Sequence, residues 1–259
     1  MPTPAIHLLP NVIARDYTTI DLQTWRQIRA CGIQSLELGA TSDPFPRELI
    51  ATLRSLGFSF LGHGSSLWHL QQHLPLFISE AQARNERFVL CYWPWLDGGE
   101  HITRAQISAS CAILQDLGRR CRQEGLRFAF HNHGLEFAHI DGTTICEHML
   151  HETDPELVSL ELDIYHMLKV GHDPLPFMAR HPHRISILHL NAMDGQGDHA
   201  IVGDGIPGFD TILALIPCVQ LVIEGHAQQD PLRYVQDSHA RLLALRSVPP
   251  GSPVTPSSR

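Results

Sequence analysis

One stretch of the chain decides the fold class: residues 127–163 read RFAFHNHGLEFAHIDGTTICEHMLHETDPELVSLELD. The stretch opens with an apolar run of strand character at residues 127–130 and closes with a second such run at residues 158–162. The longer segment between the two runs has helical spacing. A strand, a helix and a second strand in this order are typical of a parallel sheet.

The same alternation extends outward along the chain in both directions. Eight short apolar runs occur, and each is followed by a longer stretch with helical spacing. Eight such units in about 245 residues predict a single (β/α)8 TIM barrel, because a doubly wound sheet usually has fewer strands and a glycine-rich first turn. The runs are residues 5–9, 35–38, 58–61, 88–92, 127–130, 158–162, 186–190 and 221–223.

Capping residues mark where several helices should begin and end. The clearest pairs are Asp21 with Gly32, Asp43-Pro44 with Gly57, and Thr103 with Gly125. No linker rich in proline, glycine or serine interrupts the alternation, so residues 1–246 are predicted to form one barrel domain. Residues 247–259 are rich in proline and serine, and we expect a disordered tail there.

Composition narrows the class of protein. The chain has 259 residues, 43% of them hydrophobic, and a formal net charge of -8, which argues against nucleic acid and anionic membranes as partners. The first ten residues lack the pattern of a signal peptide, and no apolar run approaches the roughly 20 residues of a membrane span. The six cysteines show no Cys-x-x-Cys pair. We therefore expect a cytoplasmic protein with reduced thiols.

Ionisable side chains stand at the ends of four consecutive predicted strands: His131, Asp163, His189 and Glu224. In a TIM barrel the reactive groups lie at these carboxyl ends. Buried among Leu, Ile, Val and Phe, such groups are costly unless a cation compensates them. Two imidazoles and two carboxylates suit Mn²⁺, Co²⁺, Fe²⁺ or Zn²⁺, whereas Mg²⁺ prefers oxygen ligands alone. The pattern therefore predicts a catalytic divalent-metal site, with His133 as an alternative to His131 for the ligand from the fifth predicted strand.

Several other features of the sequence point to weaker alternatives. A single histidine on an apolar strand is more often a hydrogen-bonded core residue than a ligand. The triplet at residues 131–133 spells a nuclease motif, but it ends a barrel strand in an acidic protein. No G-x-S-x-G elbow supports a serine hydrolase, and the only lysine, Lys169, falls past the strand end that a Schiff-base aldolase needs. Glycines in residues 202–209 could bind a phosphate or simply permit a tight turn.

Six motifs of the chain match a known family, and they are residues 128–137, 160–166, 171–174, 184–190, 202–205 and 221–224. Through them the chain resembles the sugar phosphate isomerase/epimerase family, the xylose isomerase-like TIM barrels. In that family a divalent metal is commonly held by Glu, Asp, His and Glu from four successive strands. The resemblance implies that Asp163, His189 and Glu224 are the last three ligands and that His131 stands in place of the first glutamate.

The resemblance also implies an activity. We expect an isomerase or epimerase that acts on a keto-sugar or sugar phosphate through an enediolate, and similar proteins commonly form homo-oligomers. Glu224 would remove the proton, His133 and His166 would act as acid or orient a hydroxyl, and Glu37, His63, Glu136 and His166 would bind the sugar.

Two departures from the family keep other activities open. Histidine at position 131 weakens a symmetric two-glutamate epimerisation and leaves room for a dehydratase or lyase acting on an inosose or a 3-keto-glycoside. Asn191 stands where many members have a lysine soon after the histidine at position 189. A non-catalytic sugar-binding barrel and a DNA-repair endonuclease on the same barrel are the remaining alternatives, and the negative net charge counts against the second.

Overall fold

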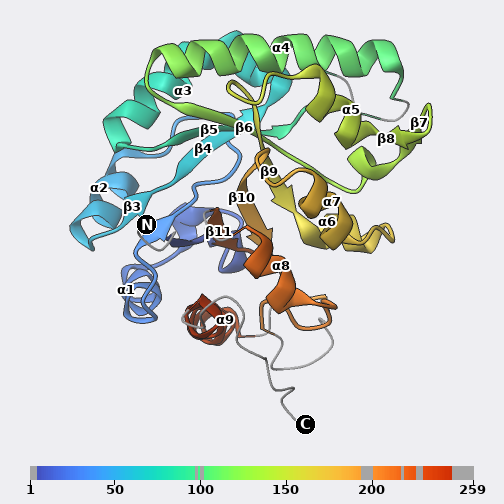
Figure 1. Ribbon diagram of the computed structural model, residues 1–259. Coiled ribbons are helices and arrows are strands. Elements are labelled where there is room, and N and C mark those ends of the chain that lie inside the picture. Colours follow the sequence, from blue (N-terminus) through green and yellow to red (C-terminus); the bar gives the residue numbers. More distant parts are fainter. Residues whose placement is uncertain are drawn as a thin grey trace.

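The computed structural model describes residues 5–96, 99, 102–193, 201–216, 219–225 and 230–246. Its main sheet has nine parallel strands in the order β3-β2-β1-β11-β10-β9-β6-β5-β4. The sheet closes between its ends, because Leu38 N donates to Gly62 O at 2.9 Å and Ala40 bridges Gly64. Figure 1 shows the helices arranged around the outside of these strands. The predicted TIM barrel is confirmed.

The strands and helices follow one another along the described residues as predicted. The strands are β1 Ile6–Leu8, β2 Ser35–Leu36, β3 Ser59–Phe60, β4 Gly62–Ser66, β5 Phe88–Trp93, β6 Arg127–His131, β9 Ser159–Asp163, β10 Ile185–Leu190 and β11 Gln220–Ile223, with a small hairpin of β7 His139–Ile140 and β8 Thr143–Thr144. The helices are α1 Leu22–Ala30, α2 Arg47–Ser55, α3 Leu67–Arg84, α4 Arg104–Gln123, α5 Ile145–Glu152, α6 Ile164–Lys169, α7 Pro174–Arg180, α8 Phe209–Leu215 and α9 Pro231–Arg246.

The third barrel strand is longer than its apolar run predicts. β3 and β4 form one strand that is interrupted at Leu61, and β4 continues to Ser66. A Cβ on Gly64 would lie 1.6 Å from Leu90 O, so glycine is required where β4 approaches β5. A strand of glycine and polar residues has no apolar alternation, which is why its pattern in the sequence ends early.

Two of the three predicted helix starts are confirmed. The Asp21 side chain accepts a hydrogen bond from Thr24 N before α1, and Thr103 forms a capping box with Gln106 before α4. The third start is wrong: α2 begins at Arg47, after Pro46, and not at Asp43-Pro44. Proline disfavours helical geometry in the residue before it, so the helix cannot begin until Pro46 has been passed.

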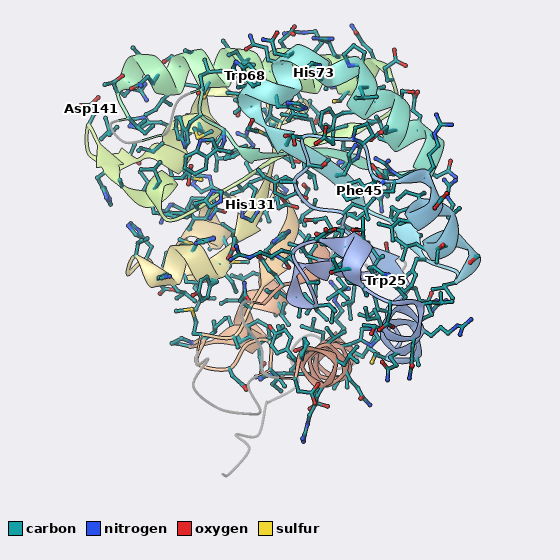
Figure 2. All side chains as sticks on the ribbon, turned by 180° about the vertical axis from the view of Figure 1, so that it is seen from behind. Trp25, Phe45, Trp68, His73, His131 and Asp141 are labelled. Atoms are coloured by element: carbon teal, nitrogen blue, oxygen red, sulfur yellow. The ribbon has the colours of Figure 1, made fainter. Side chains whose placement is uncertain are left out.

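The interior of the barrel contains a separate apolar cluster beneath the strand ends. Its members include Ala129, Ile187 and Val222, each two residues before His131, His189 and Glu224 respectively. Successive side chains alternate across a strand, so the apolar residue and the following ionisable residue face the same interior. Figure 2 shows His131 at the centre of the molecule among the strands. The remaining core residues pack in a second cluster.

Within the described residues, no helix combines the length and hydropathy of a membrane span. The tail predicted at residues 247–259 lies outside the described residues.

Candidate active site

The four predicted metal ligands lie on neighbouring strands of the barrel. His131 and Asp163 end β6 and β9, His189 lies in β10, and Glu224 directly follows β11. All four side chains belong to residues that are at most 7% exposed. The parallel register places Asp163 opposite His189, so these two side chains emerge at the same level.

Distances between donor atoms show how these side chains meet. His189 Nδ1 lies 3.0 Å from Glu224 Oε2, and His131 Nε2 lies 3.9 Å from Asp163 Oδ2. One donor atom each from His131, Asp163 and His189 falls within 4.8 Å of the others. Glu224 joins this group through His189. The structure therefore brings together all four residues that the strand-end pattern selected.

The electrostatics of the group suit a bound cation. Burial, reinforced by Glu224, raises the pKa of Asp163 to about 8, and its Oδ2 forms no hydrogen bond with any described residue. Burial lowers the pKa of His131 to about 3, so this imidazole is neutral and offers a lone pair. A buried, unsatisfied carboxylate oxygen beside a neutral imidazole fits the mixed nitrogen and oxygen ligation that a divalent ion requires.

His189 has the opposite electrostatic character. Burial alone lowers its pKa, but the nearby Glu37 and Glu161 carboxylates outweigh burial and hold the pKa well above its usual value. A positive imidazolium in this position compensates part of the buried negative charge. A divalent ion bound between these groups would take over that compensation.

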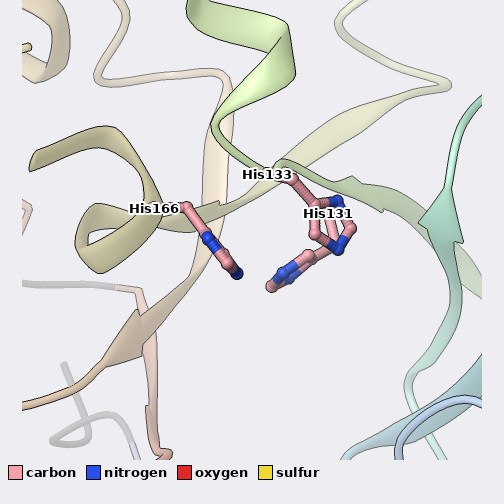
Figure 3. Close-up of side chains that lie close together, drawn as sticks. All are labelled: His131, His133 and His166. Atoms are coloured by element: carbon pink, nitrogen blue, oxygen red, sulfur yellow. The ribbon is translucent and has the colours of Figure 1, made fainter. Parts of the chain in front are cut away.

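Three imidazoles form a second group above the first. Figure 3 shows His131 from β6, His133 from the following loop and His166 from α6 side by side. The ring centroids of His133 lie 5.1 Å from those of both His131 and His166. Burial and the neighbouring His131 lower the pKa of His133 to about 4, which leaves it neutral at pH 7. The ligand atoms of His131, Asp163 and His189 lie close enough to hold one ion, and so do those of His131, His133 and His166.

Glu37 also reaches the cluster, but from below. Its Oε1 lies 3.0 Å from His189 Nε2 and accepts a hydrogen bond of 2.8 Å from the Tyr92 hydroxyl. The residue is fully buried, and burial together with Glu161 raises its pKa to about 7. Glu37 therefore contacts His189 on the side away from Glu224.

Both carboxylate oxygens of Glu136 accept hydrogen bonds from other residues of the protein. Its Oε1 accepts a hydrogen bond of 2.7 Å from Trp95 Nε1, and its Oε2 accepts one of 2.7 Å from His133 N. Both donors lie on loops that follow barrel strands. Glu136 thus anchors the loop that presents His133, which is a different task from the sugar contact expected of it.

His63 is not brought to the cluster. It alternates with Gly62 and Gly64 in β4, so its side chain lies on the face that packs against α3. There His63 Nδ1 lies 2.5 Å from Glu86 Oε2, and its Nε2 lies 3.3 Å from Glu80 Oε2. The ring is fully buried and stacks on Phe77. The expected contact between His63 and sugar has no support in this geometry.

Sequence reasoning missed several residues that touch the cluster. Glu161 precedes Asp163 by two residues on the same face of β9, and strand alternation alone could have found it. Asn11 Nδ2 donates to Glu224 Oε1 at 3.3 Å, and the Tyr234 hydroxyl donates to Glu224 O at 2.7 Å. No local pattern marks Asn11 or Tyr234, because their contacts are formed by barrel closure.

The glycine-containing turn after β10 uses its backbone donors internally. Gly203 N donates to Asn191 O, Asp204 N to Ile201 O, and Ile206 N to Gly203 O. Gly203 has φ of +91°, as a tight turn requires. Of the two interpretations of residues 202–209, this geometry supports the turn.

The sequence profile described as "Xylose isomerase-like TIM barrel" matches residues 25–242. The chain belongs to this family. The match covers most of the barrel and includes every strand that contributes a candidate ligand. The family resemblance of the sequence motifs is thereby confirmed.

Individual members of the family give a narrower comparison. An inosose dehydratase of Bacillus cereus (strain AH820) is 28% identical over 140 residues, which are 46% of this chain and 46% of that protein. The chain thus matches about half the length of this curated relative. A sugar phosphate isomerase/epimerase from Parabacteroides distasonis ATCC 8503 superposes with a TM-score of 0.77 at 18% identity over 93% of this chain and 98% of that chain. An L-ribulose 3-epimerase superposes with a TM-score of 0.72 at 15% identity over 94% of each chain. At these identities the solved structures show the shared fold.

Proposed function

We propose that this protein is a divalent-metal-dependent isomerase or epimerase of a keto-sugar, working through an enediolate. The observation that supports this most is the joint position of His131, Asp163, His189 and Glu224 at the carboxyl ends of consecutive strands. These four residues would hold the ion. When bound, a divalent ion supplies Lewis acidity that polarises the substrate carbonyl and lowers the cost of negative charge next to it.

Glu224 is the proposed base. Its carboxylate is oriented from two sides, by His189 Nδ1 at 3.0 Å from Oε2 and by Asn11 Nδ2 at 3.3 Å from Oε1. The Tyr234 hydroxyl holds its backbone carbonyl. An oriented carboxylate at the mouth of the barrel can remove the proton next to a substrate carbonyl.

His133 and His166 are the proposed partners of the substrate hydroxyls. His133 is neutral at pH 7, so its imidazole can donate one hydrogen bond and accept another. His166 lies across from it, with Nε2 3.7 Å from Asp163 Oδ2. Both side chains are partly exposed, as substrate contact requires. One of them would return the proton or protonate a departing hydroxyl.

Dehydration is the second candidate. Two observations favour it: the curated relative named above is an inosose dehydratase, and three imidazoles, of His131, His133 and His166, gather beside the candidate metal site. The first half of the reaction, loss of the proton next to the carbonyl, is common to both candidates. An imidazole that protonates a hydroxyl on the neighbouring carbon would turn the same intermediate toward loss of water.

The turn after β10 supports an unphosphorylated substrate. The amide groups of Gly203, Asp204 and Ile206 donate to backbone carbonyl groups of the protein, and Lys169 lies exposed on α6 against the ring of Tyr165. Phosphate recognition commonly uses such amides or a lysine. A ketose, an inosose or a 3-keto-glycoside is therefore the proposed substrate class.

The test begins with elemental analysis of the purified protein. Protein freed of metal with a chelator is then supplied with Mn²⁺, Co²⁺, Zn²⁺ or Mg²⁺ and incubated in D₂O with ketoses, inososes and 3-keto-glycosides. We expect the NMR signal of the proton next to the carbonyl to disappear only in samples that were incubated with metal. The metal is removed after the incubation, before the spectra are recorded. A new epimer or isomer would identify the first candidate, and an unsaturated product the second. A protein that binds no divalent ion and exchanges no proton of any of these ketones with the solvent would contradict the proposal.

Variants locate the chemistry. Glu224→Gln should abolish proton exchange, and Asp163→Ala should abolish metal binding as well. Asp116→Asn serves as the matched control, because Asp116 is an exposed carboxylate on α4 whose contacts are with Arg119 and Arg120. Full activity in Glu224→Gln would refute its role as the base.

A further inference from the structure

Glu161 is a buried carboxylate that the proposed reaction does not use. It lies in the middle of β9, on the same face as Asp163, and its residue is 0% exposed. Its two oxygens face two different imidazoles: Oε2 lies 3.3 Å from His131 Nδ1, and Oε1 lies 3.2 Å from His189 Nε2. Both contacts are at ion-pair distance, and neither Glu161 oxygen nor His131 Nδ1 forms a hydrogen bond with a described residue. The carboxylate therefore lies between the two histidines of the candidate metal site.

The ring nitrogens that face Glu161 are the ones that point away from the other two candidate ligands. His131 directs Nε2 toward Asp163, and His189 directs Nδ1 toward Glu224. A neutral imidazole has one N–H donor and one lone pair. A proton held on the Glu161 side of each ring leaves the lone pair on the opposite nitrogen, which faces Asp163 in one case and Glu224 in the other.

Glu37 does not replace Glu161 in this arrangement. Glu37 Oε1 also approaches His189 Nε2, at 3.0 Å, but the same oxygen receives the Tyr92 hydroxyl. Among the ion pairs of the described residues, His131 Nδ1 pairs with Glu161 alone. Glu161 is therefore the carboxylate that links the two rings.

We propose that Glu161 is a positioning residue: with the ion bound, its carboxylate accepts the N–H of His131 Nδ1 and, together with Glu37, that of His189 Nε2, and so orients both rings. This inference rests on the proposed function, because it assigns the lone pairs to the side where the ion would bind. Carboxylates that receive the distal N–H of a ligating histidine orient the ring and increase its basicity.

Simple packing does not account for a carboxylate at this position. Leu160 and Leu162 flank Glu161 in the strand, and a leucine would fill the same space without the cost of burying a charge. A buried carboxylate is stabilised only when donors satisfy its oxygens. Here the facing groups are the two imidazoles, so the charge of Glu161 is compensated by the orientation of the rings.

The deciding experiment substitutes Glu161→Gln and reads the ring N–H proton signals in ¹H–¹⁵N correlation spectra of histidine-labelled protein loaded with Zn²⁺. The amide of glutamine has one acceptor oxygen, so it can accept an N–H from one ring only. We expect the ring N–H of one histidine to keep its downfield, slowly exchanging signal and that of the other to lose it. Glu161→Leu should release both rings. Spectra of His131→Gln and His189→Gln variants assign the signals.

The matched control is Glu86→Gln. Glu86 is also a buried carboxylate in contact with a histidine, His63, but on the outer face of the sheet. Its substitution should change the signals of His63 and leave those of His131 and His189 unchanged. If Glu161→Gln leaves both ring N–H signals of the site as in the unsubstituted protein, the positioning role is refuted.

Metal affinity provides the second readout. Loss of such a carboxylate typically weakens metal binding by about 10–100-fold, so titration calorimetry with Zn²⁺ should show that loss in Glu161→Gln. Loss of binding as complete as in Asp163→Ala would make Glu161 a ligand and overturn the positioning role. If the unsubstituted protein binds no divalent ion, the proposed function fails, and the effect of Glu161→Gln on the ring signals of the neutral His131 in the metal-free protein still tests the contact between Glu161 and that ring.

Discussion

Asn132 and Asp163 hold each other through two hydrogen bonds between neighbouring strands. Asn132 Oδ1 accepts from Asp163 N at 2.9 Å, and Asn132 Nδ2 donates to Asp163 O at 3.1 Å. Asn132 is fully buried and directly follows His131 at the end of β6. The pair therefore fixes the position of the Asp163 backbone relative to the histidine that stands next to Asn132.

Asn132→Ala should destabilise the protein and weaken metal binding. Both hydrogen bonds disappear, and the backbone N–H and C=O of Asp163 are left unsatisfied, so we expect a loss of about 2–4 kcal/mol in the free energy of unfolding. Urea denaturation measures this loss. Asn132→Asp keeps the acceptor for Asp163 N but places a carboxylate oxygen against Asp163 O in a buried site, so its effect should be at least as large. Unchanged stability in Asn132→Ala would show that the pair contributes nothing.

Glu136→Gln tests the anchor of the His133 loop. A glutamine oxygen can replace one of the two carboxylate acceptors, and its amide group then faces the other N–H, from Trp95 or His133. We expect the free energy of unfolding to fall by about 1–3 kcal/mol, with a change in Trp95 fluorescence. Glu124→Gln, at an exposed site, is the control. Stability and fluorescence equal to those of the control would contradict the anchoring role.

Gly64→Ala should prevent the normal pairing of β4 with β5. The added Cβ would lie 1.6 Å from Leu90 O, and backbone on both sides leaves little room for relaxation. Soluble expression and thermal unfolding measure the effect, which should exceed that of Gly171→Ala. A Cβ at Gly171 meets nothing within 4 Å, so only its φ of +83° opposes that substitution, at about 1 kcal/mol. Equal effects of the two substitutions would argue against a close approach at Gly64.

His7 should make the fold less stable in mild acid. Burial lowers its pKa from 6.5 to about 4, although its hydrogen bond with Gln220 partly opposes this shift. Between these pH values the unfolded chain binds more protons than the folded one, so the free energy of unfolding falls as the pH falls from 6.5 toward 4. The contribution of His7 is at most about 3 kcal/mol.

His7→Gln removes the titrating ring and keeps a donor for Gln220. Urea denaturation at pH 7 and pH 4.5 should therefore show a smaller loss of stability in His7→Gln than in the unsubstituted protein. Because other buried histidines contribute to both proteins equally, the difference isolates His7. The same pH dependence in both proteins would refute the assignment.

Local patterns predicted the barrel well, and they failed where a strand consists of glycine and polar residues. The helix starts at Asp21 and Thr103 were readable because a cap bonds to a backbone N–H three residues away. The sequence did not predict a strand beyond Leu61, because close contact with the backbone of β5 requires glycines in β4 and these show no apolar alternation. His63 was expected near the sugar because it follows a strand run, but β4 continues and turns it toward α3.

The sequence by itself determined the fold class, the family and the side chains at the strand ends, because alternation along a strand and capping of a helix depend on residues close together in the chain. Only the tertiary structure decided which groups face one another. Glu37 and Glu161 both meet His189, although Glu37 is separated from it by most of the barrel in sequence. Such contacts arise when parallel strands close into a barrel, since closure fixes distances between strands that no local pattern contains.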